Sequence, residues 1–281
     1  MTMGRTTMER GITMIGFAGL LLVSGAASAQ ADWTGPYVGA HGAYSFQRGG
    51  ENDILNFDAD LDGTFNDTVT NAQGANVFSP GFCSGQALGP TPADGCQQDS
   101  DNFEGGVQAG YDWQVQDDLL LGVVASYTRT KLKDSVTAFS TTPANYTFTR
   151  QLRNLYAVRG RMGYVIDDSL LYATAGVNYG NVRNTFQSSN TANEFVPFDD
   201  NASWGFDLGG GAEHRLTDSF SVGVQYLYRE LTSDNYVVRA APGTTGPTHP
   251  FRLQNPEGID MRRVINHFKT QAVEVNANYR F

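Results

Sequence analysis

Charge, cysteine and long apolar runs are all scarce in this 281-residue chain. Only 17% of the residues are charged whereas 12% are aromatic, and this combination excludes an intrinsically disordered chain, which is rich in charge and poor in aromatics. The formal charge is −10, so the chain lacks the cationic surplus that neutralising nucleic-acid phosphates requires, and we expect no nucleic-acid partner. Beyond residue 29 no apolar run approaches 18 residues, which excludes a membrane-spanning helix there.

The first 29 residues have the three parts of a secretory signal peptide. Arg5 and Arg10 form a basic start, residues 12–23 are mostly apolar, and Ala27-Ser28-Ala29 is an A-x-A cleavage site. A short membrane anchor is the alternative, but the apolar stretch is shorter than the roughly 17 residues that span a bilayer. We therefore predict export, cleavage of residues 1–29 and a mature domain over residues 30–281.

The two cysteines, Cys83 and Cys96, flank a stretch rich in Gly and Pro. In the oxidising compartment that export implies, this arrangement predicts a loop disulfide. Metal binding is the alternative, but two thiols without a nearby histidine supply too few ligands.

Alternation of apolar and polar residues marks eight strands. In the clearest, residues 273–281, every odd position is apolar or aromatic and every even one is polar, so the two sets lie on opposite faces. Leu227 interrupts the same pattern in the strand before it. The other seven strands are expected at about 38–46, 104–113, 119–127, 153–164, 170–179, 204–215 and 220–229.

The connections between these strands are alternately short and long. Three are tight and acidic, at 116–118, 167–169 and 217–219, and four are longer, at about 47–102, 134–146, 183–201 and 232–266. Bacterial outer-membrane barrels have short periplasmic turns and longer extracellular loops, whereas a sandwich with Greek-key crossings has no reason to alternate in this way. The sequence therefore predicts an all-β fold, an eight-stranded antiparallel transmembrane β-barrel with long extracellular loops, the longest at about 47–102 and 232–266.

Several segments resemble one family in particular. The predicted mature start, residues 31–39 (ADWTGPYVG), is similar to the opening of the small outer-membrane β-barrel proteins of proteobacteria, the opacity-porin-like family, and residues 171–177, 209–218, 220–231 and 278–281 resemble it as well. The resemblance implies location in the cell outer membrane of a Gram-negative bacterium, with outer-membrane lipid and lipopolysaccharide around the barrel. It also implies that the barrel assembly machinery reads the aromatic C-terminus, Tyr279 and Phe281. Such families include structural barrels, adhesins, surface antigens and weak channels.

Ten charged residues fall on the predicted inward face of the strands. Charges in a narrow lumen are costly unless they are paired, and an eight-stranded barrel is just wide enough to be filled by its own side chains. We expect a salt-bridged interior plug; a gated narrow pore is the functional alternative. The ten are Glu104, Asp112, Arg159, Arg161, Asp207, Glu213, Arg215, Arg229, Glu274 and Arg280.

The first long loop contains the pattern D-x-D-x-D-G at Asp58, Asp60, Asp62 and Gly63, which matches the first half of an EF-hand calcium loop. The twelfth position is Val69, where that motif places Glu. An acidic, solvated loop is therefore the alternative to a calcium site, and we expect no other cofactor.

The end of the last long loop, residues 261–269, is basic. Its cations near an extracellular rim could bind lipopolysaccharide phosphates, although an ordinary entry into a strand explains them as well.

Signatures of catalysis are missing from the sequence. The four histidines, His41, His214, His249 and His267, form no H-E-x-x-H motif, and there is no G-x-S-x-G elbow. We therefore expect no enzymatic activity, and a lipid-modifying enzyme of the outer membrane ranks third. The first hypothesis is a structural or surface-interaction role through the extracellular loops, with an extracellular or host ligand that the sequence does not name. The second is a narrow porin for small solutes or ions.

Overall fold

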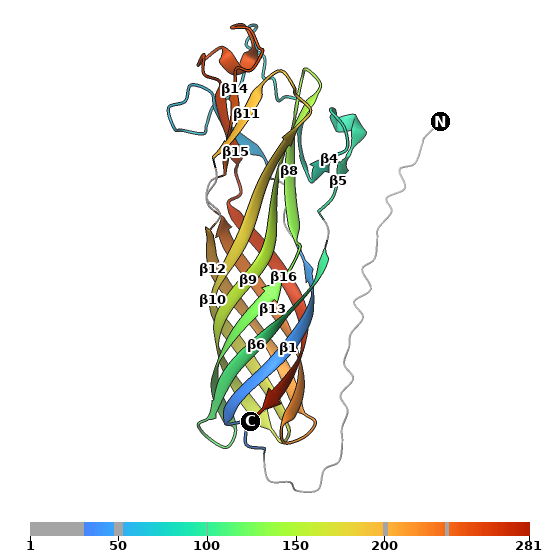
Figure 1. Ribbon diagram of the computed structural model, residues 1–281, viewed down its shortest axis with the longest axis vertical. Helices are drawn as coiled ribbons and strands as arrows, with labels where there is room; N and C mark the ends of the chain where they lie inside the picture. The colour runs from blue at the N-terminus through green and yellow to red at the C-terminus, as the bar shows by residue number, and fades with distance from the viewer. Residues whose placement is uncertain (1–30, 48–52, 100, 199–201, 234–235) are drawn as a thin grey trace, which may run out of the picture.

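The computed structural model describes residues 31–47, 53–99, 101–198, 202–233 and 236–281; the predicted signal peptide lies outside them. Eight antiparallel strands of the described chain form a closed barrel with an elongated shape (Figure 1). They are β1 (Gly35–Phe46), β6 (Asn102–Gln114), β7 (Leu119–Arg129), β9 (Ala144–Ile166), β10 (Ser169–Ser188), β12 (Ala202–Arg215), β13 (Phe220–Ser233) and β16 (His267–Arg280). The predicted eight-stranded barrel is confirmed. No helix in the described residues is long and apolar enough to cross a membrane.

Pairing of the last strand with the first closes the barrel. The register of β16 on β1 runs from Tyr37 opposite Arg280 to Phe46 opposite Gln271, and every other barrel strand pairs with its neighbours in the chain order of the eight. Closure leaves no free sheet edge in the membrane, which is the condition for crossing lipid with strands. The three tight turns lie together at the end where the C-terminus lies, so this is the periplasmic end (Figure 1).

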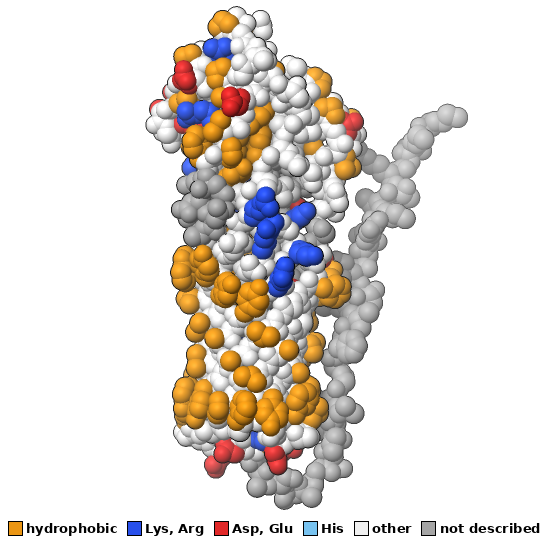
Figure 2. Space-filling view, in the orientation of Figure 1, with side chains coloured by type: hydrophobic (Ala, Val, Ile, Leu, Met, Phe, Trp, Pro, Cys, Tyr) orange, Lys and Arg blue, Asp and Glu red, His pale blue; other side chains and the backbone are white. Residues whose placement is uncertain are grey.

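The outer surface has two hydrophobic rings (Figure 2). Side chains alternate in and out along each strand. On β9, Tyr156, Val158, Met162 and Tyr164 are exposed on the outer surface, whereas the alternate residues 157, 159, 161 and 163 are buried. Tyr156 and Tyr164 are eight residues apart, which at about 3.3 Å per residue and a tilt of about 40° separates their rings by roughly 20 Å. This spacing matches the apolar band of an outer-membrane barrel.

The strands β9 and β10 continue well beyond the barrel wall. They stay paired up to Tyr146 opposite Ser188, and β8 (Lys133–Ser140) pairs with the upper part of β9. The connection predicted at about 134–146 is therefore present, and most of it is a β-hairpin. Six consecutive β8 residues are buried. Val136 and Ala138 pack into the core above the barrel, while Ser135 and Thr137 pair with Thr149 and Thr147 of β9, so the hairpin does carry a short period-2 pattern.

The long extracellular connections fold together above the barrel. Here a four-stranded sheet has the order β11-β14-β15-β2, and β3 adds to β8. We call residues 53–99, 133–150, 184–198 and 236–264 the extracellular domain. Its further elements are β2 (Leu55–Asp58), β3 (Gly81–Ser84), β4 (Gln86–Ala87), β5 (Cys96–Gln97), β11 (Glu194–Phe198), β14 (Val237–Ala241), β15 (Ile259–Arg263) and the 3-10 helices η1 (Pro92–Asp94) and η2 (Pro250–Arg252).

Candidate functional site: a filled barrel below a folded extracellular domain

The barrel lumen is crossed by buried ion pairs. Arg161 on β9 donates to both oxygens of Asp112, at 2.7 Å for Nε to Oδ1, and its Nη1 lies 2.9 Å from Glu213 Oε2. Arg280, near the C-terminus, donates to the same Asp112 at 2.8 Å. Four strands are thus tied together through the interior by two guanidiniums and two carboxylates.

A second group of charges lies next to the first. Arg159 donates to Asp207 at 3.0 Å, and Arg229 pairs with Glu104 and, at 3.5 Å, with Glu274. All five of these side chains are almost completely buried. Nine of the ten predicted interior charges therefore lie in the lumen and meet a partner of opposite sign.

Arg215 is placed differently from the other nine. It lies half-buried at the periplasmic rim, where it donates to the backbone carbonyls of Asp32 and Asp218. Its position at the last residue of β12 explains this, because the strand has left the lumen there. Arg215 does lie on the inward face of β12, as predicted. Its contact with Asp32, in the segment that leads into β1, could not be predicted from the alternation.

Glycine makes room for the buried pairs. A Cβ on Gly122 of β7 would lie 2.1 Å from Asp112 Oδ1 and 3.0 Å from Arg161 Cγ. A larger residue at this position would therefore displace the pair between Asp112 and Arg161, since such a contact is shorter than any real Cβ makes.

A layer of buried apolar side chains lies at the extracellular end of the lumen. Six completely buried residues from four barrel strands and the β7–β8 link pack together: Leu132, Leu152, Leu155, Val182, Leu231 and Phe268. We call these six the apolar seal. Leu227, which interrupts the alternation of β13, is also fully buried. This interruption was the sequence signal for an apolar part of the interior, which the predicted salt-bridged plug did not include.

A smaller apolar cluster lies at the periplasmic end. Trp33, just before β1, packs with Leu120, Val165, Leu170 and Tyr172. Arg280 stacks over the Trp33 ring at 5.2 Å and so joins this cluster to the ion pairs. In the described residues the lumen contains apolar layers at both ends and charges between them.

The extracellular domain has a hydrophobic core of its own. Sixteen buried residues form it, drawn from β2, the rest of the first loop, β8, β9, β14, η2 and β15. Phe78 lies at its centre, stacked on Phe57 with ring centroids 4.3 Å apart and on Phe251 at 6.0 Å, and in edge contact with Tyr146. The first and last long connections are thus held together by aromatic packing.

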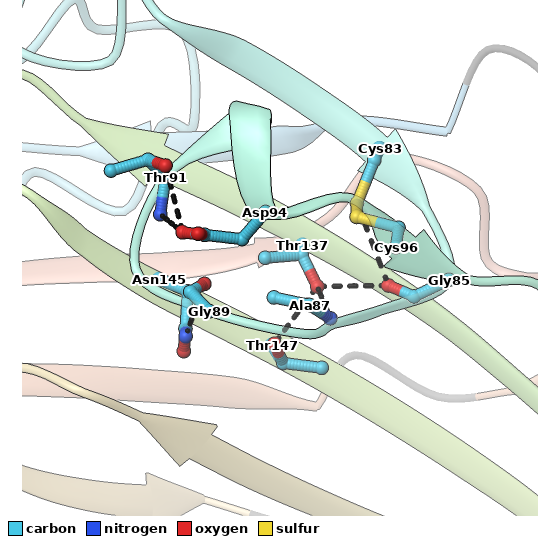
Figure 3. The surroundings of a disulfide bond; sticks show 10 residues. All are labelled: Cys83, Gly85, Ala87, Gly89, Thr91, Asp94, Cys96, Thr137, Asn145 and Thr147. Atoms are coloured by element: carbon cyan, nitrogen blue, oxygen red, sulfur yellow. Dashed lines mark hydrogen bonds between the residues drawn. A yellow bond between two sulfur atoms is a disulfide. The ribbon is translucent and has the colours of Figure 1, made fainter.

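Cys83 and Cys96 are joined by a disulfide in this domain (Figure 3). The segment between them lies across the β8–β9 hairpin, where Thr137 Oγ1 donates to the Gly85 carbonyl at 2.8 Å and Asn145 Nδ2 to the Gly89 carbonyl at 2.9 Å. The disulfide therefore closes a loop that is also held by hydrogen bonds to the hairpin.

The carboxylates of the calcium motif are grouped differently from the prediction. Asp58, Asp60 and Asp67 place oxygens within 4.8 Å of one another, whereas Asp62 gives its backbone N–H to Asp58 and Asp60 and accepts from Thr64 N. Asp67 takes the place of Asp62 because a bridge pairs it with Phe57, which the spacing of the motif could not indicate. Asp58 also accepts from Gly63 N at 2.8 Å, so the loop's own amides already use these carboxylates.

A cleft of about 210 Å³ opens between three connections of the extracellular domain. The turn at 140–144, residues 189–192 and the start of η2 line it, together with Val77 and Tyr146. Burial lowers the pKa of His249, with a further contribution from Arg252, so the imidazole in the cleft is neutral at neutral pH. This cleft could not be predicted, because its three walls are far apart in the chain.

A buried polar cluster connects the domain to the seal. Arg150 donates to Asp134 at 2.7 Å and stacks over Phe268, while Arg263 pairs with both Asp53 and Asp134. Although burial opposes it, the charges of Arg150 and Arg263 lower the pKa of Asp134 to about 2. Asp99, which accepts from Ser135 N at 2.9 Å, has its pKa raised to about 7, first by burial and then by the charge of Asp134.

We expect the extracellular domain to lose stability as the pH rises from about 4 to about 7. An unfolded aspartate titrates near 3.9, so in this range the folded chain binds more protons at Asp99 than the unfolded chain does. The stabilisation is complete below pH 4 and is lost as the pH rises through 7. Hydrogen exchange of residues 83–99, corrected for the intrinsic pH dependence, should show faster opening at pH 7.5 than at pH 5, and Asp99→Asn should abolish this difference. Equal pH dependence in the wild type and the variant would contradict the assignment to Asp99.

The basic segment at 261–269 is occupied by contacts within the chain. Arg262 stacks over Phe65 at 4.0 Å, Arg263 belongs to the buried cluster, and Lys269 and His267 lie 3.9 and 3.0 Å from Glu230. These cations therefore do not form the free basic patch that the sequence suggested.

Two of the histidines have partners that the sequence did not indicate. His214 Nδ1 lies 2.9 Å from Ser169 Oγ at the exposed periplasmic end, and His41 in the lumen lies 3.0 Å from Thr128 Oγ1. Ser169 begins β10 and is directly opposite His214, near the end of the paired strand β12.

Comparison with known proteins places the chain in a family. The family model for the outer membrane protein beta-barrel domain matches residues 15–281. This chain belongs to that family. It is an outer-membrane protein, as the resemblance of its strands implied.

Two curated relatives are outer-membrane proteins as well. The 31 kDa outer-membrane immunogenic protein of Brucella melitensis biotype 1 is 31% identical over 136 residues, which are 48% of this chain and 56% of that protein. The 22 kDa outer membrane protein of Rhizobium leguminosarum bv. viciae is 32% identical over 80 residues, 28% of this chain and 34% of that protein. The chain therefore spans about half the length of these relatives or less. Among solved structures, OprG from Pseudomonas aeruginosa superposes with a TM-score of 0.48 at 12% identity, over 90% of this chain and 99% of OprG.

Proposed function

We propose that this outer-membrane barrel is a closed support that presents its extracellular domain to ligands outside the cell. The observation that carries the proposal is the sixteen-residue core of the extracellular domain. Loops that only join strands need no shared core, since each residue ordered outside the membrane costs about 1–2 kcal/mol of backbone entropy. The packing of Phe78 on Phe57 and Phe251 offsets that cost and gives the domain one fixed surface.

Two further features support a role in recognition. The cleft beside Tyr146 and His249 offers a concave, partly apolar surface with backbone groups and hydroxyls at its rim, which is the kind of site that binds small ligands or single side chains. The Brucella relative is named for its immunogenicity, and exposure on the cell surface is the property that we propose for this domain.

Adherence of cells that display the chain tests the proposal. Cells producing the wild type, Phe78→Ala or Leu88→Ala would be applied to immobilised extracellular-matrix glycoproteins and glycans, with equal surface amounts verified by labelling. Leu88 is 65% exposed and serves as the matched control, because its truncation leaves the core intact. We expect the wild type and Leu88→Ala to adhere to at least one probe and Phe78→Ala to lose this adherence. Equal adherence of all three, or none by the wild type, would contradict the proposal.

A narrow porin is the second candidate, and one observation favours it. Among the described residues, buried lumen atoms such as His41 Nδ1, Glu104 Oε2 and Arg229 Nε have no hydrogen-bond partner in the protein. Buried polar groups of this kind are commonly satisfied by water, and a hydrated lumen is the first requirement of a channel. Conductance separates the two candidates.

A further inference from the structure

Five exposed cations lie together on the outside of the barrel at its extracellular end. Figure 2 shows a group of Lys and Arg side chains directly above the upper hydrophobic ring, whereas acidic side chains lie below the lower ring. We call them the basic belt: Arg129, Lys131, Lys133, Arg153 and Arg183.

Strand pairing brings four of the five side chains into one patch, and Lys131 lies in the adjoining link between Thr130 and Leu132, whose backbone groups bond to Arg153 and Leu152 of β9. Arg129 of β7 is opposite Asn154 of β9, and Gln151 of β9 is opposite both Lys133 of β8 and Arg183 of β10. Arg153 is the extra residue of a bulge between these two rows, and its carbonyl accepts from Thr130 N at 3.0 Å. Since neighbouring strands are about 4.8 Å apart, the patch from β7 to β10 is only about 10 Å wide.

A row of aromatic side chains around the barrel marks the depth of the basic belt relative to the membrane. Tyr127, Tyr156, Tyr179 and Trp204 form a continuous row of ring contacts across β7, β9, β10 and β12, with centroids 5.0–6.4 Å apart. Such rings lie at the boundary between hydrocarbon and headgroups. Arg129, Arg153 and Arg183 are two to four residues beyond the aromatic side chain of their own strand, which places them roughly 5–10 Å outside the hydrocarbon, at the level of lipid phosphates.

Within the described residues, no carboxylate pairs with any cation of the belt. Other exposed cations of the extracellular half are engaged: Lys269 with Glu230, Arg239 with Asp260 and Arg262 with Phe65. Five like charges within one Debye length repel one another unless an anion lies among them. The repulsion and the position together call for an anionic group supplied from outside the chain.

We propose that the basic belt is a binding site for the phosphates of an outer-leaflet glycolipid, with the acyl chains on the aromatic row below. Guanidiniums suit this ligand, because their planar fork of N–H donors matches two phosphate oxygens at once. The amides of Asn154, Asn181 and Gln151 lie between the cations and offer donors to the sugar hydroxyls. The bound lipid would hold the extracellular domain at a fixed height above the membrane. This inference concerns the barrel wall and does not rest on the proposed function.

Native mass spectrometry of the detergent-solubilised chain with lipid A tests the site. The probes are lipid A with two phosphates, the same lipid without phosphates, and inorganic phosphate as a competitor. In the variant R129Q/K131Q/K133Q/R153Q/R183Q, we expect the apparent dissociation constant for bisphosphorylated lipid A to rise at least about tenfold. The dephosphorylated lipid should bind the wild type no better than it binds this variant, and inorganic phosphate should not compete.

A matched pair of single variants distinguishes binding by the basic belt from a general effect of positive charge on the protein. Arg153→Gln should weaken binding of bisphosphorylated lipid A several-fold, whereas Lys269→Gln, which removes a cation already paired with Glu230, should leave it unchanged. Heat-modifiable migration on gels verifies that each variant is folded. Three results would overturn the proposal: equal binding by the fivefold variant, equal binding of the dephosphorylated lipid, or displacement by inorganic phosphate, which would indicate a site for free anions.

Discussion

Replacement of Arg161 by methionine is expected to destabilise the barrel by about 3–5 kcal/mol. The guanidinium contacts Asp112 on both oxygens and Glu213 on one, and all three side chains are at least 94% buried. Methionine fills much of the same volume but leaves the two carboxylates with one guanidinium fewer, and a buried charge without its partner carries most of its desolvation cost. Urea unfolding in detergent, followed by the loss of heat-modifiable gel migration, measures the difference.

The control for this experiment is Arg215→Met. Arg215 faces the same way but lies at the periplasmic rim and donates to carbonyls that water can also reach. We expect its loss to cost at most about 1 kcal/mol, in the range of an ordinary hydrogen bond. Equal destabilisation by the two substitutions would show that the buried pairs of the lumen do not hold the barrel together.

Truncation of Phe78 to alanine is expected to destabilise the extracellular domain by about 3–5 kcal/mol and to leave the barrel intact. Phe78 is 3% exposed and packs on three other aromatic rings, so its removal leaves a cavity between the first and last long connections. Hydrogen exchange should accelerate throughout residues 53–99 and 236–264 and remain slow in the barrel strands.

The exposed variant Leu88→Ala is the matched control and should exchange like the wild type. Acceleration that spreads into β1 or β16 would show that the domain and the barrel unfold as one unit. No acceleration at all would show that the aromatic packing does not stabilise the extracellular connections.

The barrel could be predicted from the sequence because each of its strands has one apolar face toward lipid and one mainly polar face toward the lumen. In β16, Val273, Val275 and Tyr279 face lipid while Glu274, Asn276 and Asn278 face the lumen, because lipid requires an apolar side chain at every outward position. The interior charges followed from the same parity. Their partners did not, because Arg161 meets Asp112 across the barrel, and that contact depends on the register and shear of strands 49 residues apart.

The extracellular domain could not be predicted for the opposite reason. β2 has four residues and the alternation of β8 covers only Ser135 to Ala138, so each run is too short to identify a strand by itself, and the strands β15 and β3 that pair with them are far away in the chain. The acidic motif in the first loop was recognised, but its third carboxylate comes from Asp67 through tertiary pairing. Leu227 is the exception, since an apolar residue on a polar face did indicate the apolar part of the lumen.

Single-channel recording in planar bilayers tests whether the barrel is filled by its own side chains beneath the extracellular domain. The folded full-length chain should give no conductance steps at any voltage that the bilayer tolerates, because the apolar seal lies above the ion pairs of Arg161 and Arg229. A large porin reconstituted in the same way is the positive control. Reproducible conductance steps from the wild-type chain would contradict this account and would identify the barrel as a channel.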